Sequence, residues 1–519
     1  MPVEQNCPFD ITPLDQSKLT EVPKFNNLVY ANQDFHSMKP RLVQFIKERF
    51  SNDFNDFVES SLAIMLIENF CFLSDLLSFK IDQIANEVFI DTVAEVENAF
   101  RLAKLVGFKP TPPISATTLF SASLLQILTV DVIVPPGLSV ELVSEGTTIN
   151  FELFLADSNN NPIFEDDIII PAGNTVNTSI VGVEGRTFTD TFSGTGASGQ
   201  SYLLNNGSVI FDSVRVDVDG VRWTEVDFFT DSQPRREYRV EFDSSYNAFV
   251  IFGNNKGGLI PGNGSIIRVI YRSGGGTIGN IITGAAAFQR NIEVPNLQFF
   301  LPVNFTNYTR GQNGYNGDGV EDIRNKLPLF IKTQDRAVTG EDYKILSEQF
   351  ITPYNGQIGK ATAVLRNHGC AGNVVDIFIL GLDANQQLVE VSDILETMLY
   401  DYLLTKKMIT DFVCLRDGVV LSVDVHIDVT LDKAFRKLKD EIDAKIKRRI
   451  DKFFVLSNWD YGQSLRDSDL VKGLSDVKEV SLYDISFLTN DPNNQGQIVT
   501  SKYFEIIRPD QITLNYVFV

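Results

Sequence analysis

The sequence is poor in the residues that most often build metal, redox and disulfide sites. Its 519 residues include only 3 His and 4 Cys. The cysteines, Cys7, Cys71, Cys370 and Cys414, form no Cys-x-x-Cys pair. Spacing therefore predicts neither a disulfide framework nor a zinc site, and we expect no metal and no cofactor. Scattered cysteines of this kind are typical of a chain made in a reducing cytoplasm.

Positive charge is also in short supply. The sequence holds 45 Lys and Arg against 67 Asp and Glu, which gives a net charge of −22. Binding to a phosphate backbone requires clustered cations that displace counterions. The composition therefore disfavours nucleic acid as a partner.

Long apolar runs are missing as well. The longest unbroken apolar run in the N-terminal half, residues 62–67, is far shorter than the roughly 20 residues of a membrane helix. The first five residues carry an acid where a signal peptide carries Lys or Arg. We therefore expect neither a membrane span nor Sec-type export. The 39 Phe and the 43% apolar content instead predict a folded protein, and its length predicts several domains.

The pattern of apolar residues changes along the chain and predicts a multidomain α+β protein. Residues 1–39 form an N-terminal arm in this interpretation, and residues 40–112 are helical. Residues 113–302 are β-rich, because short apolar stretches there alternate with Pro-Gly and Asn-Gly turns. Residues 303–350 form a connector with short helices, and residues 351–519 form an α+β domain.

The helical segment carries more apolar surface than one buried face needs. Apolar residues recur at every third or fourth position, and others lie off this stripe. Such a helix is either the centre of its own domain or a member of a bundle formed with other chains, and both alternatives remain open. The stripe consists of Leu62, Leu66, Phe70, Leu73, Leu77, Ile81, Ile84 and Val88.

Three local patterns are similar to ligand sites, but each lacks an essential part. Residues 274–279 have the glycine spacing of a dinucleotide-binding turn, yet a strand-like sequence follows where a helix is needed. Residues 316–322 are rich in oxygen donors but lack the distal Glu of a calcium loop. His426 lies between Asp424 and Asp428 on one face of a predicted strand, with no nucleophile motif. We expect turns and a solvated strand face at these places, and no catalytic residue.

One stretch has a net positive charge, opposite in sign to that of the whole chain. Residues 433–452 hold nine Lys and Arg against four acids, a local charge of +5. Such a helix would steer an acidic partner, or another copy of this protein, into register. The simpler alternative is a solvated amphipathic helix. If the stretch is an interface, we expect Arg436, Arg448 and Arg449 to take part in it.

Short segments spread over most of the chain follow the order and spacing of one family. They are residues 59–68, 81–90, 105–110, 218–223, 250–253, 260–264, 276–280, 324–329, 333–343, 459–462 and 468–470. Together they resemble the baseplate J-like wedge proteins of contractile-tailed bacteriophages and related injection systems. Residues 324–343 are the most specific part of this resemblance.

The resemblance implies a structural, non-enzymatic role. A chain of this family joins a second copy and a different partner chain in a wedge. Neighbouring wedges then close a roughly six-fold ring around the hub or tube and the sheath-initiating proteins, and the ring transmits the trigger for sheath contraction. The implied location is the tail baseplate of a virion, reached from the bacterial host cytoplasm during assembly.

The functional residues implied by this interpretation form contacts between chains or domains. We expect the helix interface at Leu66, Phe70, Leu73, Leu77, Ile81 and Ile84. The resemblance centres on Arg324, Arg336, Asp342 and Tyr343, which we expect to fix the connector. The Gly-rich residues 311–319 would allow domains to reorient.

Two other functions remain as alternatives. One is a glycan-binding tail adhesin, for which Trp223 is the aromatic candidate. The other is a polysaccharide-degrading tail enzyme, although no pair of carboxylates can be placed from the sequence.

Overall fold

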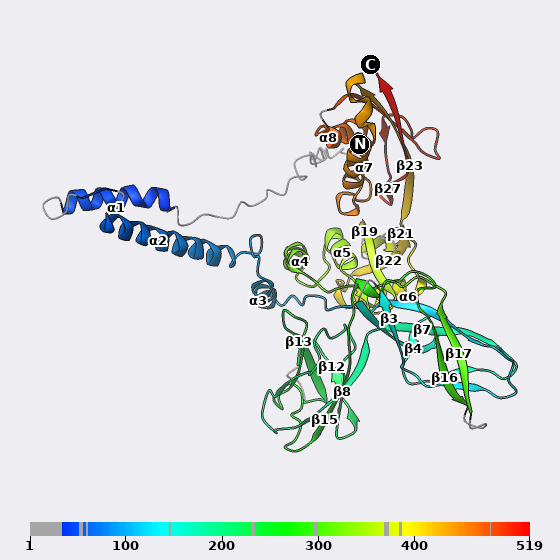
Figure 1. The fold of residues 1–519 in the computed structure, drawn as a ribbon. Helices are drawn as coiled ribbons and strands as arrows, with labels where there is room; N and C mark the ends of the chain where they lie inside the picture. Colours follow the sequence, from blue (N-terminus) through cyan, green and yellow to red (C-terminus); the bar gives the residue numbers. More distant parts are fainter. Residues whose placement is uncertain are drawn as a thin grey trace, which may run out of the picture. The chain divides into compact units, whose positions relative to one another are not determined.

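The computed structural model describes residues 34–50, 56–58, 61–144, 147–229, 234–294, 299–367, 373–383, 387–477 and 479–519. They form an N-terminal helical region, a large β-rich central part and a C-terminal α+β region, which confirms the predicted fold class (Figure 1). The predicted arm, residues 1–39, falls almost wholly outside the described residues.

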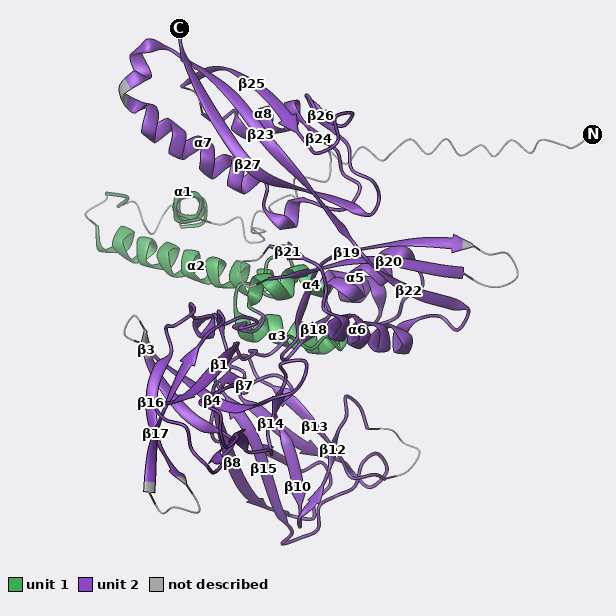
Figure 2. Ribbon diagram, turned by 90° about the vertical axis from the view of Figure 1, so that its right-hand side faces the viewer, with its two compact units in different colours: residues 1–110, 319–327 green, residues 111–318, 328–519 purple. Residues whose placement is uncertain are grey.

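Contacts divide the chain into two compact units (Figure 2). Unit 1 comprises residues 1–110 and 319–327, and unit 2 comprises residues 111–318 and 328–519. The second segment of unit 1 is the start of helix α4 (Val320–Thr333). Its Ile323 and Leu327 are buried in one cluster with Val93, Ala99 and Ala103. The predicted helical domain did not include this segment, because packing between distant segments leaves no local pattern.

Unit 1 contains three further helices, α1 (Phe35–Arg49), α2 (Leu62–Asn86) and α3 (Val96–Val106). The Asp34 carboxylate caps α1 by accepting a hydrogen bond from the Ser37 amide at 2.7 Å. Helix α3 ends at Gly107, which has a φ of 81°. Glycine adopts this left-handed conformation without a steric penalty, which explains why the helix ends there.

The first β-module of unit 2 is a seven-stranded sheet in the order β16-β17-β1-β7-β4-β3, with β5 on β4, together with a separate β2–β6 pair. Its core buries Phe120, Phe151 and Phe305. The strands are β1 (Thr117–Leu124), β2 (Val132–Val134), β3 (Leu138–Ser144), β4 (Thr147–Ala156), β5 (Pro162–Ile163), β6 (Ile168–Ile170), β7 (Val176–Glu184), β16 (Ala287–Val294) and β17 (Phe299–Asn307).

The second β-module consists of two four-stranded sheets, β11-β10-β15-β8 and β12-β13-β14-β9. Asp219 and Gly220 form the turn of a hairpin, in which β10 pairs with β11 and both turn residues have positive φ. The elements are β8 (Arg186–Ser193), β9 (Ser201–Leu203), β10 (Arg215–Val218), β11 (Val221–Arg222), β12 (Thr224–Glu225), β13 (Glu237–Phe242), β14 (Ala248–Phe252), β15 (Ile266–Ser273) and the 3-10 turn η2 (Thr277–Gly279).

A buried ion pair joins the two β-modules. Arg272 of β15 pairs with the Glu152 carboxylate of β4, and both side chains are at least nine-tenths buried. The same guanidinium donates to the carbonyl oxygens of Val183 and Glu184, each at 3.1 Å. Since β7 continues into β8 through Gly185, these bonds fix the point at which the chain passes from one module to the other.

The C-terminal region begins with a sheet in the order β18-β19-β20-β21, with β22 paired to β20. Helices α5 and α6 supply Tyr343, Leu346, Leu395 and Leu399 to its core. The elements are α5 (Gly340–Glu348), β18 (Ile351–Thr352), β19 (Gly356–Asn367), β20 (Asn373–Leu382), β21 (Leu388–Val389), α6 (Asp393–Lys406) and β22 (Asp411–Asp417).

The region ends with a three-stranded sheet, β25-β23-β27, whose core includes Ile442, Ile446 and Ile450 of α7. The helix predicted from residue 433 begins as a 3-10 segment. The elements are β23 (Val419–Leu431), η4 (Lys433–Leu438), α7 (Lys439–Phe453), η5 (Leu456–Asn458), β24 (Leu465–Arg466), α8 (Asp467–Leu474), β25 (Val480–Leu488), β26 (Ile498–Val499) and β27 (Glu505–Phe518).

Candidate functional site

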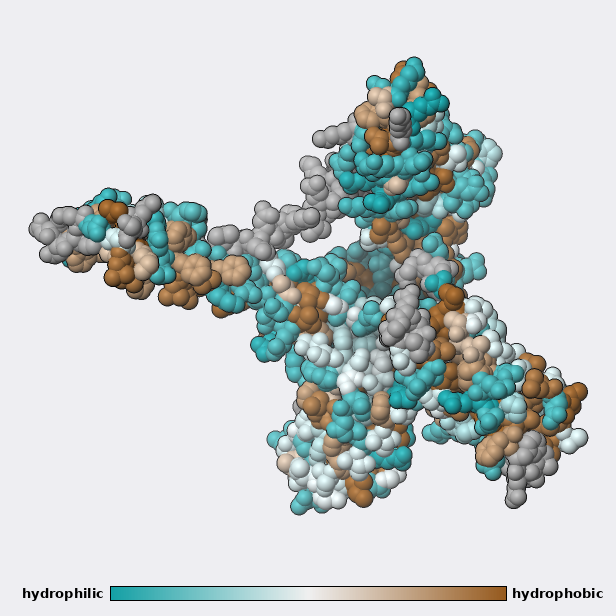
Figure 3. Space-filling view, in the orientation of Figure 1, coloured by the Kyte–Doolittle hydropathy of each residue, from teal (hydrophilic) through white to brown (hydrophobic). Residues whose placement is uncertain are grey.

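Helix α2 exposes its apolar stripe to solvent. The six side chains predicted for the helix interface are between 50% exposed, at Leu66, and 66% exposed, at Phe70. Figure 3 shows apolar residues gathered over this part of the molecule. Soluble proteins rarely expose a contiguous apolar surface of this kind unless it binds another molecule.

The exposure is not confined to one face of α2. Met65, Phe72, Leu76 and Phe79, which lie off the predicted stripe, are also exposed. Along the helix only Ile64, Cys71, Ser78 and Asn86 are buried. Among the described residues, α2 is therefore not the buried centre of its own domain.

Helix α2 also meets the length and composition criteria of a membrane span. It has 25 residues and a mean hydropathy of 1.7 over an 18-residue window, of which 17% is buried. The expectation of no membrane span stays a prediction, because length and composition alone do not distinguish a membrane helix from a helix covered by protein. It relied on unbroken apolar runs, and Glu68 and Asp75 interrupt the run within α2.

The four predicted connector residues lie in two separate places. Arg324 of α4 donates through Nε to the carbonyl oxygen of Val93 at 2.9 Å, and so ties the two segments of unit 1 together. Arg336 is exposed, and its guanidinium donates to Gln334 only two residues away. The structure thus gives Arg324 a bridging contact but does not bring Arg336 to Asp342.

Asp342 and Tyr343 hold α5 in place. The Asp342 carboxylate accepts a hydrogen bond from the Thr339 amide at 2.8 Å, while the Thr339 hydroxyl accepts one from the Asp342 amide at 3.2 Å. This reciprocal pair is a capping box. The fully buried Tyr343 donates to Asp411 at 2.9 Å, and burial together with this carboxylate raises the Tyr343 pKa.

Residues 311–318 of the Gly-rich segment belong to unit 2 and are held there by hydrogen bonds. The Gly311 amide donates to the carbonyl oxygen of Ile281 at 2.8 Å, and the Asn313 side chain donates to that of Tyr354 at 2.9 Å. Gln312 also pairs with Thr117 across an isolated bridge. These bonds restrain the segment that we expected to act as a hinge, whose role in domain motion stays a prediction.

Several cations of the 433–452 stretch already have neighbouring partners, and two of these partners, Glu479 and Asp476, are acids outside the stretch. Lys445, Lys447 and Arg449 form ion pairs with Glu479, Asp443 and Asp476 at 2.7 to 3.0 Å. Arg436 and Lys439 lie over the rings of Phe518 and Tyr516. Of the three predicted arginines, Arg449 forms an ion pair and Arg436 a ring contact. The exposed Arg448 has no ion pair or ring contact given among the described residues.

A second charged cluster was missed by the sequence analysis. The Asp460 carboxylate accepts from Lys360 of β19 at 2.9 Å and from Lys344 of α5 at 3.0 Å. Burial opposes the charge of Asp460, but these two ammonium groups lower its pKa. Asp460 lies in segment 459–462 of the family resemblance, and Lys344 directly follows segment 333–343. Their positions in or beside these two segments were the sequence signal that could have indicated this contact.

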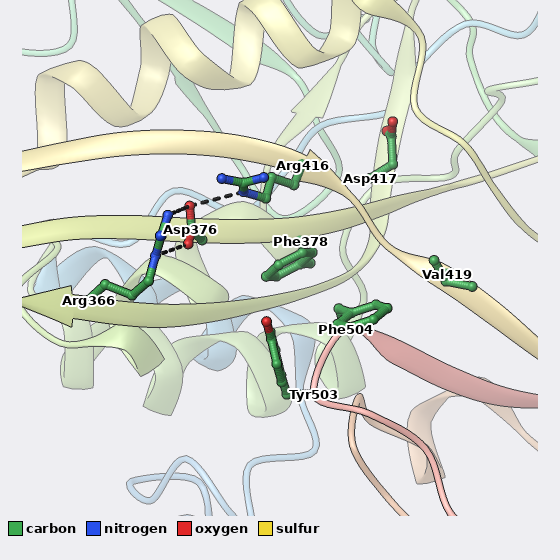
Figure 4. A pocket seen from close by; sticks show the side chains of 8 residues that line it. All are labelled: Arg366, Asp376, Phe378, Arg416, Asp417, Val419, Tyr503 and Phe504. Atoms are coloured by element: carbon green, nitrogen blue, oxygen red, sulfur yellow. Dashed lines mark hydrogen bonds and ion pairs between the residues drawn. The ribbon is translucent and has the colours of Figure 1, made fainter.

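An open pocket of about 560 Å³ lies beside β20 and β22 (Figure 4). At one end Asp376 pairs with Arg366 and Arg416. Burial opposes the charge of Asp376, yet hydrogen bonds from the two arginines lower its pKa. At the other end Phe378 packs against Tyr503 and Phe504 with ring centroids 5.6 and 5.8 Å apart. Arg366 and Arg416 already neutralise the Asp376 carboxylate. We therefore assign a structural role to the residues that line this pocket.

The patterns that were similar to ligand sites form ordinary structure. Residues 274–276 are a glycine turn with positive φ, followed by η2 instead of a long helix. Asp318 accepts a hydrogen bond from Tyr315, and Asp322 accepts one from the Gly319 amide. Within the described ranges, no group of three or more His, Cys, Asp or Glu side chains is arranged to hold a metal ion.

Comparisons with known proteins add two distant structural likenesses. No protein-family model matches the sequence, and a search of curated proteins found no match. One similar chain is from the cryo-EM structure of the anti-feeding prophage baseplate, with 10% identity, coverage of 91% of this chain and 90% of the other, and a TM-score of 0.40. Another is from the TssK-TssF-TssG baseplate subcomplex of the type VI secretion system, with 10% identity, coverage of 68% and 96%, and a TM-score of 0.29.

Proposed function

We propose that this chain is a structural component of the baseplate of a contractile injection machine. The observation that carries the proposal is the apolar surface of α2, which is exposed on more than one face. A helix of this kind becomes stable in water when neighbouring helices cover it. The protein therefore acts by assembling with other chains.

The partners proposed for α2 are the corresponding helix of a second copy and a helix of a different chain. Their covered face comprises Leu66, Phe70, Leu73, Leu77, Ile81 and Ile84, which is the set that the sequence predicts. The resemblance of the sequence to wedge proteins supports this trimeric arrangement.

A helical bundle explains α2 better than a lipid bilayer does. The apolar window contains the two acids Glu68 and Asp75, and Lys39 of α1 pairs with Glu68 at 2.6 Å. An acid at the centre of a membrane helix costs about 3 kcal/mol. In a bundle, the same acids lie at the edge of the seam and remain in water.

The finer parts of the proposal concern the assembled ring. Wedges containing this chain close a roughly six-fold ring around the hub or tube, and the ring transmits the trigger for sheath contraction. Arg448 of α7 contributes to contacts between wedges. The protein is then found in the tail baseplate of a virion, after assembly in the bacterial cytoplasm.

The adhesin alternative loses its aromatic candidate. Trp223 is 6% exposed and packs edge-on against Phe252 in the core of the second β-module. A glycan-binding aromatic residue must present an open face to the sugar. Trp223 therefore has a structural role.

The test replaces two interface residues by acids. We expect Phe70→Asp together with Leu77→Asp to abolish co-purification with the products of neighbouring genes, because two charges would be buried in the bundle. The matched control is Thr397→Asp with Tyr400→Asp, which adds the same charge to the exposed surface of α6. Circular dichroism must show that all variants remain folded.

Three outcomes separate the alternatives. Loss of the partner chains in the α2 variant alone supports the proposal. Retention of the partners in the α2 variant contradicts it. Flotation of the wild-type protein with phospholipid vesicles, abolished by the same α2 variant, would show that lipid covers α2 and would also overturn the proposal.

A further inference from the structure

The outer edge of β27 has no strand partner among the described residues. β27 runs parallel to β23 from Val419↔Glu505 to Leu431↔Phe518, and it is the last strand of the sheet β25-β23-β27. Figure 2 shows the two long strands running side by side. The other edge of β27 therefore presents main-chain N–H and C=O groups that no described strand uses.

This edge lacks the features that normally prevent pairing. Residues 512–518 read Ile-Thr-Leu-Asn-Tyr-Val-Phe, with no charged residue, no Pro and no Gly. Natural edge strands are commonly protected by Lys, Pro or a bulge. Here Pro509 and Asp510 protect only the beginning of the strand. A seven-residue uncharged edge is conspicuous in a chain with a net charge of −22.

The side chains of this segment are already sorted between the two faces of the sheet. Ile512, Leu514, Tyr516 and Phe518 are partly buried and pack against the core that contains α7. Thr513, Asn515 and Val517 are exposed on the opposite face. The Tyr516 hydroxyl donates to Asp443 at 2.8 Å, which holds the strand against α7. The edge is therefore in place before any partner arrives.

We propose that the β27 edges of two copies of this chain pair with each other in antiparallel orientation, centred on Asn515. Two identical strand edges related by a two-fold axis can pair with each other, so this contact requires no different partner chain. Asn515 is the midpoint of the uncharged residues 512–518, so this register pairs all seven of them and excludes Asp510.

The cross-strand pairs of this register are favourable. Ile512 faces Phe518, Leu514 faces Tyr516, and Thr513 faces Val517, so each pair lies on one face and extends the existing core or the exposed face. Pairs of aromatic and branched side chains stabilise antiparallel strands, and no like charges meet. The result is a six-stranded sheet across two molecules. This inference rests on the sheet edge alone and does not depend on the baseplate proposal.

Cysteine cross-linking tests the pairing directly. In the full chain, Asn515→Cys places a thiol opposite its own copy, where directly opposed Cβ atoms are about 5 Å apart. We expect oxidation to give a dimer whose 515–515 disulfide is identified by peptide mass spectrometry. The control is Ser486→Cys, exposed on the same sheet but on β25, which should give no such link beyond that of the oxidised wild-type chain.

Charge substitution provides the second measurement. Asn515→Lys places a lysine opposite its own copy, and Thr513→Lys adds a second lysine diagonal to it, so we expect sedimentation analysis to show dimer formation weakened at least about tenfold. Ser486→Lys should have no such effect. The inference is overturned if the lysine variant associates like the wild type, or if Asn515→Cys forms no 515–515 link. The α2 variant should still form this link, so failure at one surface is distinguishable from failure at the other.

Discussion

Glu184 lies at the end of β7, where the two β-modules meet, and it is 4% exposed. Its carboxylate accepts a hydrogen bond from the Gly275 amide at 2.7 Å. Burial raises the pKa of Glu184 to about 7, although the Gly275 amide and Arg272 favour the charged form. The site therefore holds an acid that is only partly ionised near neutral pH.

The raised pKa predicts a pH dependence of stability. Because the folded state binds the Glu184 proton more tightly than the unfolded chain, its stability is greatest below about pH 4.5 and falls as the pH rises to about 7. We expect Glu184→Gln to remove this loss, which is about 3 kcal/mol in the free energy of unfolding. Urea denaturation between pH 5 and pH 8 measures it.

The matched control for this change is Glu293→Gln, on the exposed surface of β16. It should leave the pH dependence of the wild type unchanged. Parallel pH profiles for Glu184→Gln and the wild type would contradict the prediction.

At single residues, local conformation was predictable from the sequence but contacts between distant residues were not. The left-handed turn at Asp219-Gly220 and the helix stop at Gly107 were predictable, because local backbone requirements select those residues. The pairing of Arg272 with Glu152 was not, since each is one of many charged residues and only the fold brings them together. The same holds for Asp460 with Lys344 and Lys360.

At the scale of the element, the capping box of α5 links local sequence to packing. Thr339 and Asp342 satisfy each other's amides, and the next residue, Tyr343, enters the core. A helix that starts one residue late would carry Tyr343 out of register with Asp411. The cap therefore fixes the position of a buried side chain as well as the helix end.

Removal of this cap should have a measurable cost. We expect Thr339→Ala to lower the free energy of unfolding by about 1 kcal/mol, because the Asp342 amide loses its acceptor. Thr339→Ser retains a hydroxyl and should stay close to the wild type. Equal stability of the alanine and serine variants in urea denaturation would show that the cap contributes nothing.

Elements with strong periodicity were the most predictable. β23 is a strand through Asp424, His426 and Asp428, as alternation predicts, and α2 is helical along the predicted stripe from Leu62 to Ile84. The exposure of α2 was left open by the sequence, because periodicity identifies an apolar face but not the molecule that covers it. The role of its six interface residues stays a prediction.

At the scale of the whole molecule, net charge opposes association of identical chains. A charge of −22 repels a second copy, while the apolar α2 and the uncharged β27 edge attract it. Added salt screens the repulsion, since the Debye length falls from about 10 Å at 0.1 M to about 3 Å at 1 M.

We therefore expect self-association of the isolated chain to strengthen with sodium chloride concentration. Light scattering at several protein concentrations measures this effect. Weaker association at high salt would instead show that attraction between opposite charges, such as those around Arg448, governs the contact between copies. In that case, Arg448→Glu would change how self-association depends on salt. Under our prediction, self-association of the Arg448→Glu variant still strengthens as the salt concentration rises.

The order of the helical, β-rich and α+β regions was predictable because the pattern of apolar residues changes sharply between them. The division into units was not, since the start of α4 joins the N-terminal helices across the whole β-rich part of the sequence. No local pattern in residues 319–327 distinguishes a connector from a piece of a distant core.

The discontinuous core of unit 1 has a consequence during translation. The helices before residue 110 cannot complete their core until residues 319–327 have left the ribosome. Synthesis of the intervening segment takes on the order of tens of seconds at bacterial rates. Throughout that interval the nascent chain exposes the apolar α2 to solvent, so a chaperone or an already finished partner has time to bind it before release.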